Sequence, residues 1–544
     1  LAWSYLLISL KIFSTLGFWF SNSVMICIII YLIYKKTSNK FKHIFTLVIL
    51  WVFAIHLIFF LTTPYGLFGR DVHFDYTVTA LIEKDGWPLK NEDILIRTHD
   101  TSIWPGIHFL GLMISKIIDM PLFSINDIWT ITKLLPCILS IIITLSLFTF
   151  YKNIFNDDKK SQLIITFLSS SLFYPIFFHS WFVRETLAYS LMFSGLAIFV
   201  KYFSKKGLEL AILQIIFLIA LMISHDLTFL FFLFIIGLFL FVSAIRDIKV
   251  LRYNLSILHN SIRVLLLGCI LFLAYHIFIG ESVFYTLIKT IVNLKDPKIF
   301  TERIVHKRIL WNQIIFIGRI SFAFWYSFLI GKYIIASRMS GLNRWDLCGC
   351  LSGFFGVLWI LAETIIKYVP PIGLPRLEGF IWPFVLITVC HAAKCIDKIR
   401  VITMSSFILF ILFNLFQIPP YVYSNIDPPY ESGEVSMRYP LCYYHAVYWI
   451  NPKGTLVGDL SDEELFGGLR QIKVILDREV YSGNSRSIKN YDWIAVRTEN
   501  FQLIRDQRKE VTKSICLSKK AFEMINFNCD KLYDNGNNLL YQSN

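Results

Sequence analysis

Two carboxylates and a histidine occur together where a long apolar segment of the chain ends. Asp71, His73 and Asp75 follow shortly after the apolar run that ends near Leu61. A carboxylate this close to a membrane is costly unless it is paired, hydrated or functional, and a positioned carboxylate can take a proton from a poor nucleophile. A structural role is the alternative, because Asp71 would also favour the start of a helix that begins near Phe74.

Three more polar pairs occur in short connections between later apolar segments. They are Arg184 with Glu185, His225 with Asp226, and Arg376 with Glu378. Each pair taken singly could be a structural ion pair or a polar turn. Together with the Asp71 region, they would bring acids, histidine and arginine to one membrane face, which is the arrangement expected of an active site in a membrane. Arg319 and Glu363, near the ends of their apolar segments, are expected to pair locally.

The composition indicates what must hold these residues in place. The chain has 544 residues, of which 56% are hydrophobic and 17% charged, whereas an ordinary soluble domain is about 25% charged. Runs of about 20 apolar residues, the length that crosses a bilayer, recur along residues 1–418. We therefore predict an all-α polytopic membrane bundle of about 12 or 13 transmembrane helices. The predicted spans are 16–34, 44–61, 128–150, 161–178, 183–200, 208–223, 227–245, 263–280, 311–335, 347–367, 377–393 and 401–418.

Basic residues occur in every second connection between these spans. Examples are Lys35 with Lys36, Lys159 with Lys160, and Lys205 with Lys206. Short basic loops stay in the cytoplasm, so the pattern places the first long loop, 62–127, and the end of the chain outside the plasma membrane. The net charge of +14 then reflects topology and contact with membrane lipid. No basic, aromatic-interleaved module indicates nucleic acid binding.

Residues 419–544 differ in character from the apolar part. Short apolar segments at 455–459, 473–476 and 492–496 alternate with polar stretches such as 462–471. This alternation predicts a small soluble α/β domain of about 100 residues, which the topology places outside the cell. The ten Cys form no zinc pattern, and the tail contains no Gly-rich phosphate loop.

These features together resemble the GT-C superfamily of polytopic glycosyltransferases, and most nearly its archaeal and bacterial members with a short C-terminal domain. The resemblance covers most of the membrane part. It rests on Gly69-Arg-Asp71 with Asp75, Trp104-Pro-Gly-Ile-His108, Phe182-Val-Arg184-Glu185, Ser224-His225-Asp226 and Pro375-Arg376-Leu-Glu378. The tail lacks the Trp-Trp-Asp-Tyr-Gly stretch of oligosaccharyltransferases, which argues against transfer of a whole glycan to Asn.

The resemblance implies a transferase that uses a polyprenyl-phosphate-linked sugar as donor and a hydroxyl of a glycan, lipid or protein as acceptor. In that reading Asp71 is the general base, and Asp75 or His73 orients it or the acceptor. One base and direct displacement would invert the anomeric carbon. A divalent metal, Mg²⁺ or Mn²⁺, at Asp71 and Asp75 is compatible with the same residues.

The remaining polar residues receive roles from the same implied chemistry. The leaving lipid phosphate needs charge stabilisation, which Arg184 or Arg376 would supply. Four further candidates for the site are Glu185, His225, Asp226 and Glu378.

Two other classes of protein stay open at this point. A transporter or a flippase for lipid-linked glycans would need charged or broken helices near the middle of the bilayer, where His56 is a lone candidate. A non-catalytic scaffold that presents the C-terminal domain would leave the acidic first loop without a role.

Overall fold

The computed structural model describes residues 14–62, 67, 71–87, 103–123, 129–204, 207–250, 255–278, 310–337, 342–365, 374–395, 400–416, 454–458, 473–475, 480, 491–497, 519–534 and 538–543. The chain divides into two compact units. The first comprises Leu1–Thr62, Leu134–Arg303 and Arg308–Pro428, and the second comprises Thr63–Lys133, Ile304–Lys307 and Pro429–Asn544.

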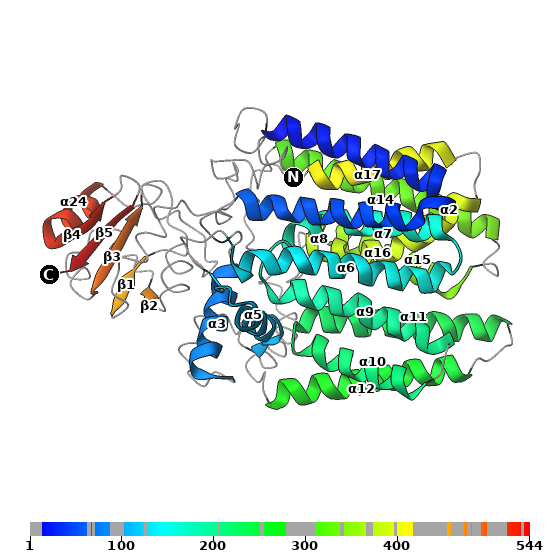
Figure 1. Cartoon of the computed structure of the whole chain (residues 1–544), viewed down its shortest axis with the longest axis horizontal. Coiled ribbons are helices and arrows are strands. Elements are labelled where there is room, and N and C mark those ends of the chain that lie inside the picture. Colours follow the sequence, from blue (N-terminus) through cyan, green and yellow to red (C-terminus); the bar gives the residue numbers. More distant parts are fainter. Residues whose placement is uncertain are drawn as a thin grey trace. The chain divides into compact units, whose positions relative to one another are not determined.

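Long helices that run back and forth make up the first unit (Figure 1). They are α2 (Ser14–Thr62), α6 (Ile131–Phe155), α7 (Lys159–Ser170), α8 (Phe173–Phe178), α9 (Arg184–Ser204), α10 (Leu208–Met222), α11 (Asp226–Val250), α12 (Leu255–Phe278), α14 (Leu310–Ser337), α15 (Arg344–Ile365), α16 (Leu374–Cys395) and α17 (Arg400–Phe416). Element α2 comprises two helices that meet at a kink at Lys40, and the first two predicted spans, 16–34 and 44–61, lie one on each side of this kink.

Several of these helices can cross a bilayer. Within the described residues, four segments are long and apolar enough, namely Lys40–Leu57, Ile131–Phe155, Asp226–Ile245 and Leu377–Lys394. Shorter apolar helices include Phe20–Lys35, Leu208–Met222, Ser261–Ile277 and Ser405–Leu415. Large apolar side chains such as Ile335 and Phe324 are exposed on the bundle, as expected of surfaces that face lipid. The chain is a polytopic helical membrane protein.

Glycines allow α15 and α16 to pack closely. A Cβ atom at Gly349 would overlap the hydroxyl of Thr388 and lie 2.5 Å from the carbonyl oxygen of Phe384. Gly353 and Gly356 continue the same face, against Val385 and Ile381. Small residues at such spacing let helix backbones approach each other within a membrane, where packing rather than the hydrophobic effect drives association.

A buried carboxylate joins three helices at one end of this unit. Asp346 on α15 is 1% exposed. Its Oδ2 accepts hydrogen bonds from the Tyr333 hydroxyl at 3.1 Å and the Asn343 amide at 3.0 Å, and its Oδ1 lies 2.5 Å from Nδ1 of His391. Buried polar groups need hydrogen-bond partners, and here the partners come from different helices. The cluster therefore fixes the ends of α14, α15 and α16 relative to one another.

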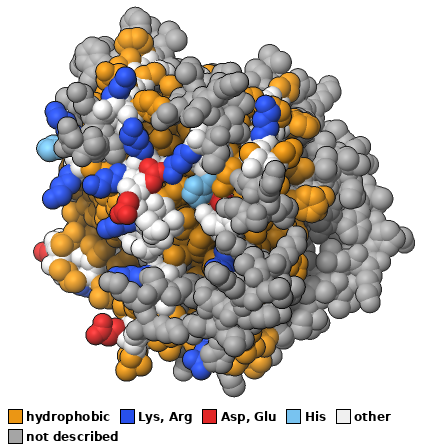
Figure 2. Space-filling view, turned by 90° about the vertical axis from the view of Figure 1, so that its right-hand side faces the viewer, with side chains coloured by type: hydrophobic (Ala, Val, Ile, Leu, Met, Phe, Trp, Pro, Cys, Tyr) orange, Lys and Arg blue, Asp and Glu red, His pale blue; other side chains and the backbone are white. Residues whose placement is uncertain are grey.

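Basic side chains gather at the same end of the first unit. Figure 2 shows Lys and Arg side chains spread over this face, with fewer acidic ones among them. Exposed members are Lys35, Lys42, Lys152, Lys159, Lys160, Lys201 and Lys394. They come from the connections that the sequence pattern assigns to the cytoplasm.

In the second unit, α3 (Asp71–Asp85) and α5 (Gly106–Ile118) pack against each other. Asp75 pairs with His108, and two turns further along both helices Glu83 forms an ion pair with Lys116. The two helices therefore run in the same direction. The 13 residues of α5 are too few to span a bilayer, for which about 20 are needed.

The described residues near the C-terminus form five strands and a helix. The sheet has the order β2-β1-β3-β5-β4, with β1 parallel to both neighbours and β5 antiparallel to both of its own. The elements are β1 (Thr455–Val457), β2 (Lys473–Ile475), β3 (Trp493–Arg497), α24 (Lys519–Asn528), β4 (Cys529–Asp534) and β5 (Asn538–Ser543). Val457, Ile494, Val496, Ala521 and Ile525 form its core. Strands β1, β2 and β3 occur where the sequence predicts them, whereas the predicted helix 462–471 lies outside the described residues.

Candidate functional site

Asp75 lies in a fully buried chain of polar contacts between α3 and α5. The Thr79 hydroxyl donates to the carbonyl oxygen of Asp75 at 2.7 Å, so its oxygen must accept from Nδ1 of His108, 2.9 Å away. Nε2 of His108 then faces Oδ1 of Asp75 at 3.5 Å. A histidine ring held in this way presents a fixed nitrogen to the carboxylate. His108, which the sequence singled out only as part of a motif, is therefore a partner of Asp75.

Asp71 is the first residue of α3. The sequence suggested a helix that begins near Phe74, with Asp71 at or just before its start. In the structure the helix begins at Asp71. Residues four apart share a helix face, so Asp71 lies on the face that carries Asp75. The side chain of Asp71 lies outside the described residues. Its role as a general base therefore stays a prediction. His73 is buried, and its carbonyl oxygen accepts the Thr77 hydroxyl at 2.8 Å.

Arg184 and Glu185 begin helix α9 in the first unit. Glu185 is 4% exposed. His179, in the turn that precedes α9, is buried between the rings of Tyr174 and Tyr189, with ring centroids 5.2 and 4.3 Å away. Burial lowers the pKa of His179 to about 3, and the nearby Glu185 carboxylate raises it only in part. The imidazole is therefore neutral at physiological pH, and sequence reasoning gave it no role.

His225 and Asp226 occupy the start of α11. Nδ1 of His225 accepts a hydrogen bond from the Thr228 amide at 3.3 Å, and Oδ1 of Asp226 lies 2.6 Å from the Leu227 amide. Both side chains thereby satisfy backbone donors that a helix start leaves open. This capping role is the structural alternative for two residues that the sequence proposed as site candidates.

Glu378, on α16, pairs with Arg319 on α14. The Arg319 Nε atom lies 3.2 Å from Oε1 of Glu378, and the two side chains are 16% and 17% exposed. Arg319 therefore pairs with an acid from a distant part of the sequence. Glu363 and Arg376 lie in α15 and α16, with side chains outside the described residues.

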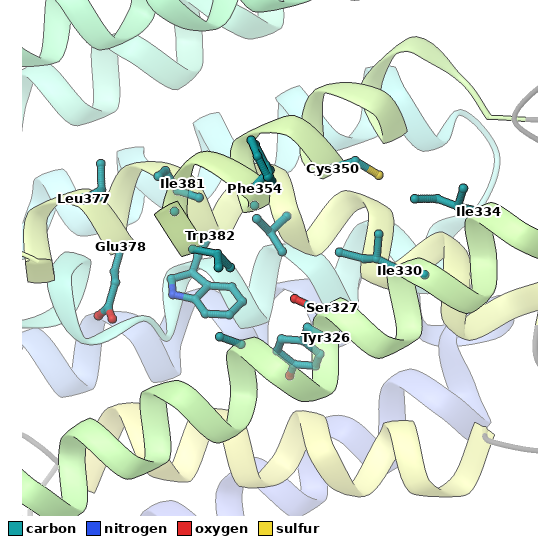
Figure 3. Close-up of a pocket in the computed structure, with 16 residues that line it drawn as sticks. Tyr326, Ser327, Ile330, Ile334, Cys350, Phe354, Leu377, Glu378, Ile381 and Trp382 are labelled. Carbon is teal, nitrogen blue, oxygen red and sulfur yellow. The ribbon is translucent and has the colours of Figure 1, made fainter. Parts of the chain in front are cut away.

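Glu378 also stands at the end of an apolar groove in the first unit. The groove holds about 320 Å³ and lies between α14, α15 and α16. Both α14 and α15 pack against α16 but barely contact each other, which leaves the space open. Figure 3 shows Glu378 at one end, and Cys350 and Ile334 at the other. Tyr326, Ile330, Ile381 and Trp382 contribute to walls that are almost entirely apolar.

The candidate site residues of the first unit share one end of the bundle, where α9, α11 and α16 begin. Helices α9, α11 and α16 begin at the end opposite the basic face (Figure 1). The Tyr189 hydroxyl donates to the Gly379 carbonyl at 2.7 Å, which ties α9 to α16 directly beside Glu378. In the part of the chain that the structure describes, no group of three or more His, Cys, Asp or Glu side chains could hold a metal ion.

The fold has solved relatives. Oligosaccharyltransferase AglB from Archaeoglobus fulgidus, in complex with an inhibitory peptide and a dolichol-phosphate, matches with a TM-score of 0.51 at 12% identity, over 85% of this chain and 70% of AglB. The chain has a GT-C-like fold. ArnT from Cupriavidus metallidurans, bound to undecaprenyl phosphate, matches with a TM-score of 0.47 at 10% identity, over 93% of this chain and 98% of ArnT. No protein-family model and no curated protein matches the sequence.

Within the GT-C-like fold, the sequence found the polar residues but not their partners. It singled out Asp75 and Glu378, yet their partners His108 and Arg319 come from other helices. The sequence also did not indicate that Tyr174 and Tyr189 would enclose His179. An aromatic residue in an apolar run is usually part of the core.

Proposed function

We propose that this protein is a membrane glycosyltransferase that transfers a sugar from a polyprenyl-phosphate-linked donor to an acceptor hydroxyl. The observation that carries the proposal is an apolar groove with a charged pair at one end, Arg319 and Glu378, in a GT-C-like fold. A polyprenyl phosphate has the complementary chemistry, a long apolar chain that ends in an anion. The solved relative AglB contains a dolichol-phosphate, which agrees with such a donor.

The groove suits the isoprenoid chain of the donor. Its walls are apolar, and it lies between α14 and α15, whose exposed Phe328 and Phe354 would face lipid. Gly331 lies in its lining, and a Cβ atom there would meet nothing within 4 Å. An apolar chain entering this space from the bilayer would replace lipid contacts with protein contacts, so little desolvation opposes its entry.

The transfer itself would be a direct displacement. The acceptor oxygen forms a bond to the anomeric carbon while the bond from that carbon to the lipid phosphate oxygen breaks, and Asp71 takes the proton of the acceptor hydroxyl. The lipid phosphate leaves as an anion, so it needs no second carboxylic acid, and the anomeric carbon is inverted. Asp75, held by His108, and His73 would orient the base or the acceptor.

Cations would stabilise the phosphate that leaves. Arg184 and Arg376 are proposed for this role, since both belong to the end of the bundle at which α9 and α16 begin. Further candidates for the site are Glu185, His225, Asp226 and Glu378. Two of them, His225 and Asp226, already accept hydrogen bonds from backbone amides at the start of α11. A Mg²⁺ or Mn²⁺ ion at Asp71 and Asp75 would supply further positive charge.

The arginine roles can be tested by exchange for lysine. Purified full-length protein is given a polyprenyl-phosphate-linked sugar, and the free polyprenyl phosphate is measured. Arg184→Lys or Arg376→Lys should slow release about tenfold, because the charge stays but the two-pronged contact with phosphate is lost. Arg263→Lys, at an exposed position on α12, is the matched control.

Two outcomes would count against these assignments. Lysine variants that both match the parent protein would make Arg184 and Arg376 structural. A parent protein that moves the donor across vesicle membranes without cleaving it would be a flippase, and the transferase proposal would fall.

The orientation in the membrane is proposed from the alternating basic connections. With about 12 or 13 spans, the 62–127 loop and the α/β domain, 419–544, would both lie on the outer side of the plasma membrane. The glycan, lipid or protein acceptors would be on the same side. The exposed basic face of the first unit (Figure 2) agrees with a cytoplasmic position for that end of the bundle.

Cysteine labelling in intact cells tests this orientation. A membrane-impermeant thiol reagent should label Asn537→Cys and Lys90→Cys but not Lys205→Cys, each compared with the unsubstituted chain to subtract its own ten cysteines. Labelling of only one of the two outer positions would place the loop and the tail on opposite sides and refute the topology.

A further inference from the structure

Glu378 stands where a lipid phosphate would be expected at the groove. Its carboxylate lies 3.2 Å from Nε of Arg319, and it lines the groove between Leu377 and Ile381. Both charged side chains are mostly removed from solvent, at 17% and 16% exposure. In apolar surroundings an arginine strongly prefers to keep an anionic partner, so an incoming phosphate meets a guanidinium that already has one.

The backbone beside Glu378 is held in place. Gly379 accepts a hydrogen bond from the Tyr189 hydroxyl at 2.7 Å, and a Cβ atom at this position would overlap the ring of Tyr174. The α16 backbone thus cannot withdraw Glu378 from the end of the groove. When rotation of the Glu378 side chain releases Arg319, the displaced carboxylate stays close to the anion that replaces it.

We propose that Glu378 is a competing carboxylate: it holds Arg319 while the groove is empty, gives way to the lipid phosphate, and favours release of the lipid phosphate after transfer. The inference rests on the proposed function, because it assumes that a polyprenyl phosphate enters this groove. Two anions near one guanidinium repel each other, so Glu378 lowers the affinity for the phosphate end without affecting the apolar chain.

The consequence is a specific effect on ligands that carry the phosphate. Undecaprenyl phosphate and undecaprenol share the apolar chain, and only the first has the anion. Removing the charge of Glu378 should therefore change binding of the first and leave binding of the second unchanged. A residue that only supports the fold would affect both ligands or neither.

Binding to purified full-length protein in detergent tests the proposal. In Glu378→Gln, which keeps the shape of the side chain, undecaprenyl phosphate should bind about fivefold more tightly, as expected when a modest ion pair no longer competes. Arg319→Gln should bind it more weakly than the parent protein. Undecaprenol should bind all variants equally. Glu209→Gln, at an exposed site on α10, removes the same charge elsewhere and should change nothing.

The outcomes separate this inference from the proposed function. Unchanged or weaker phosphate binding by Glu378→Gln, or a loss of binding that accompanies a lower Tm, would make the pair structural and overturn the inference alone. A parent protein that does not bind undecaprenyl phosphate more tightly than undecaprenol would remove the phosphate site, and with it both proposals.

Discussion

The Asp71→Asn protein should fold, bind the lipid-linked donor and transfer sugar about 10²–10⁴-fold more slowly than the parent protein, the range typical for loss of a positioned base. Asparagine keeps the shape and hydrogen-bonding capacity of the side chain but cannot accept a proton at neutral pH. If Asp71 only favours the start of α3, the exchange costs at most about 1 kcal/mol of stability and leaves transfer intact. Single-turnover rates with saturating donor, together with Tm, distinguish the two roles.

Asp75→Asn is the companion variant. Its carboxylate faces His108 in a buried contact of 3.5 Å, so a purely orienting role predicts a milder loss of transfer than at Asp71. Equal losses at both positions, with a dependence on added Mg²⁺ or Mn²⁺, would indicate that the two carboxylates share a metal. Unimpaired transfer by Asp71→Asn would remove Asp71 from the chemistry.

Filling the groove should weaken donor use without damaging the fold. Gly331 lines the groove, and a Cβ atom there would meet nothing within 4 Å. A Phe side chain at this position would extend into the space proposed for the isoprenoid chain. We expect Gly331→Phe to raise the KM for the lipid-linked donor at least about tenfold. Burying one large apolar side chain contributes about 1.5–3 kcal/mol, and the donor would lose an apolar contact of about that size.

Gly237 on α11 supplies the matched control. It too has nothing within 4 Å of its added Cβ, but it is not part of the groove lining. Gly237→Phe should therefore leave KM and Tm near those of the parent protein. A Gly331→Phe protein with the same donor KM as Gly237→Phe would show that the chain of the donor binds elsewhere.

The apolar segments were predictable because a bilayer imposes a length and a composition on each of them. The boundaries of α9 and α11 illustrate this: both begin at polar residues, Arg184 and Asp226, that the sequence had placed in turns. Even the first carboxylate of the long loop, Asp71, is found at a helix start, although the helix begins three residues earlier than expected.

Side-chain partners across helices were not predictable from one sequence. Arg319 meets Glu378 because α14 and α16 are packed together, and no local spacing encodes that neighbourhood. The same holds for the pairing of Asp75 with His108, which depends on two helices that run in one direction. The groove was not predictable either. It exists because α14 and α15 both pack against α16 but make few contacts with each other.

Glycines of this bundle differ in how freely they could be replaced over evolutionary time. Gly331 and Gly237 both have open space around them, so mutation can explore larger residues at either position. Only Gly331 lines the groove, so only changes at Gly331 could adjust the groove to lipids of other shapes. Gly379 has the Tyr174 ring against it, and Tyr174 is itself packed against His179 and Phe380. Any change at position 379 would require several neighbours to change together, so the charged end of the groove should diverge much more slowly between lineages than its apolar walls.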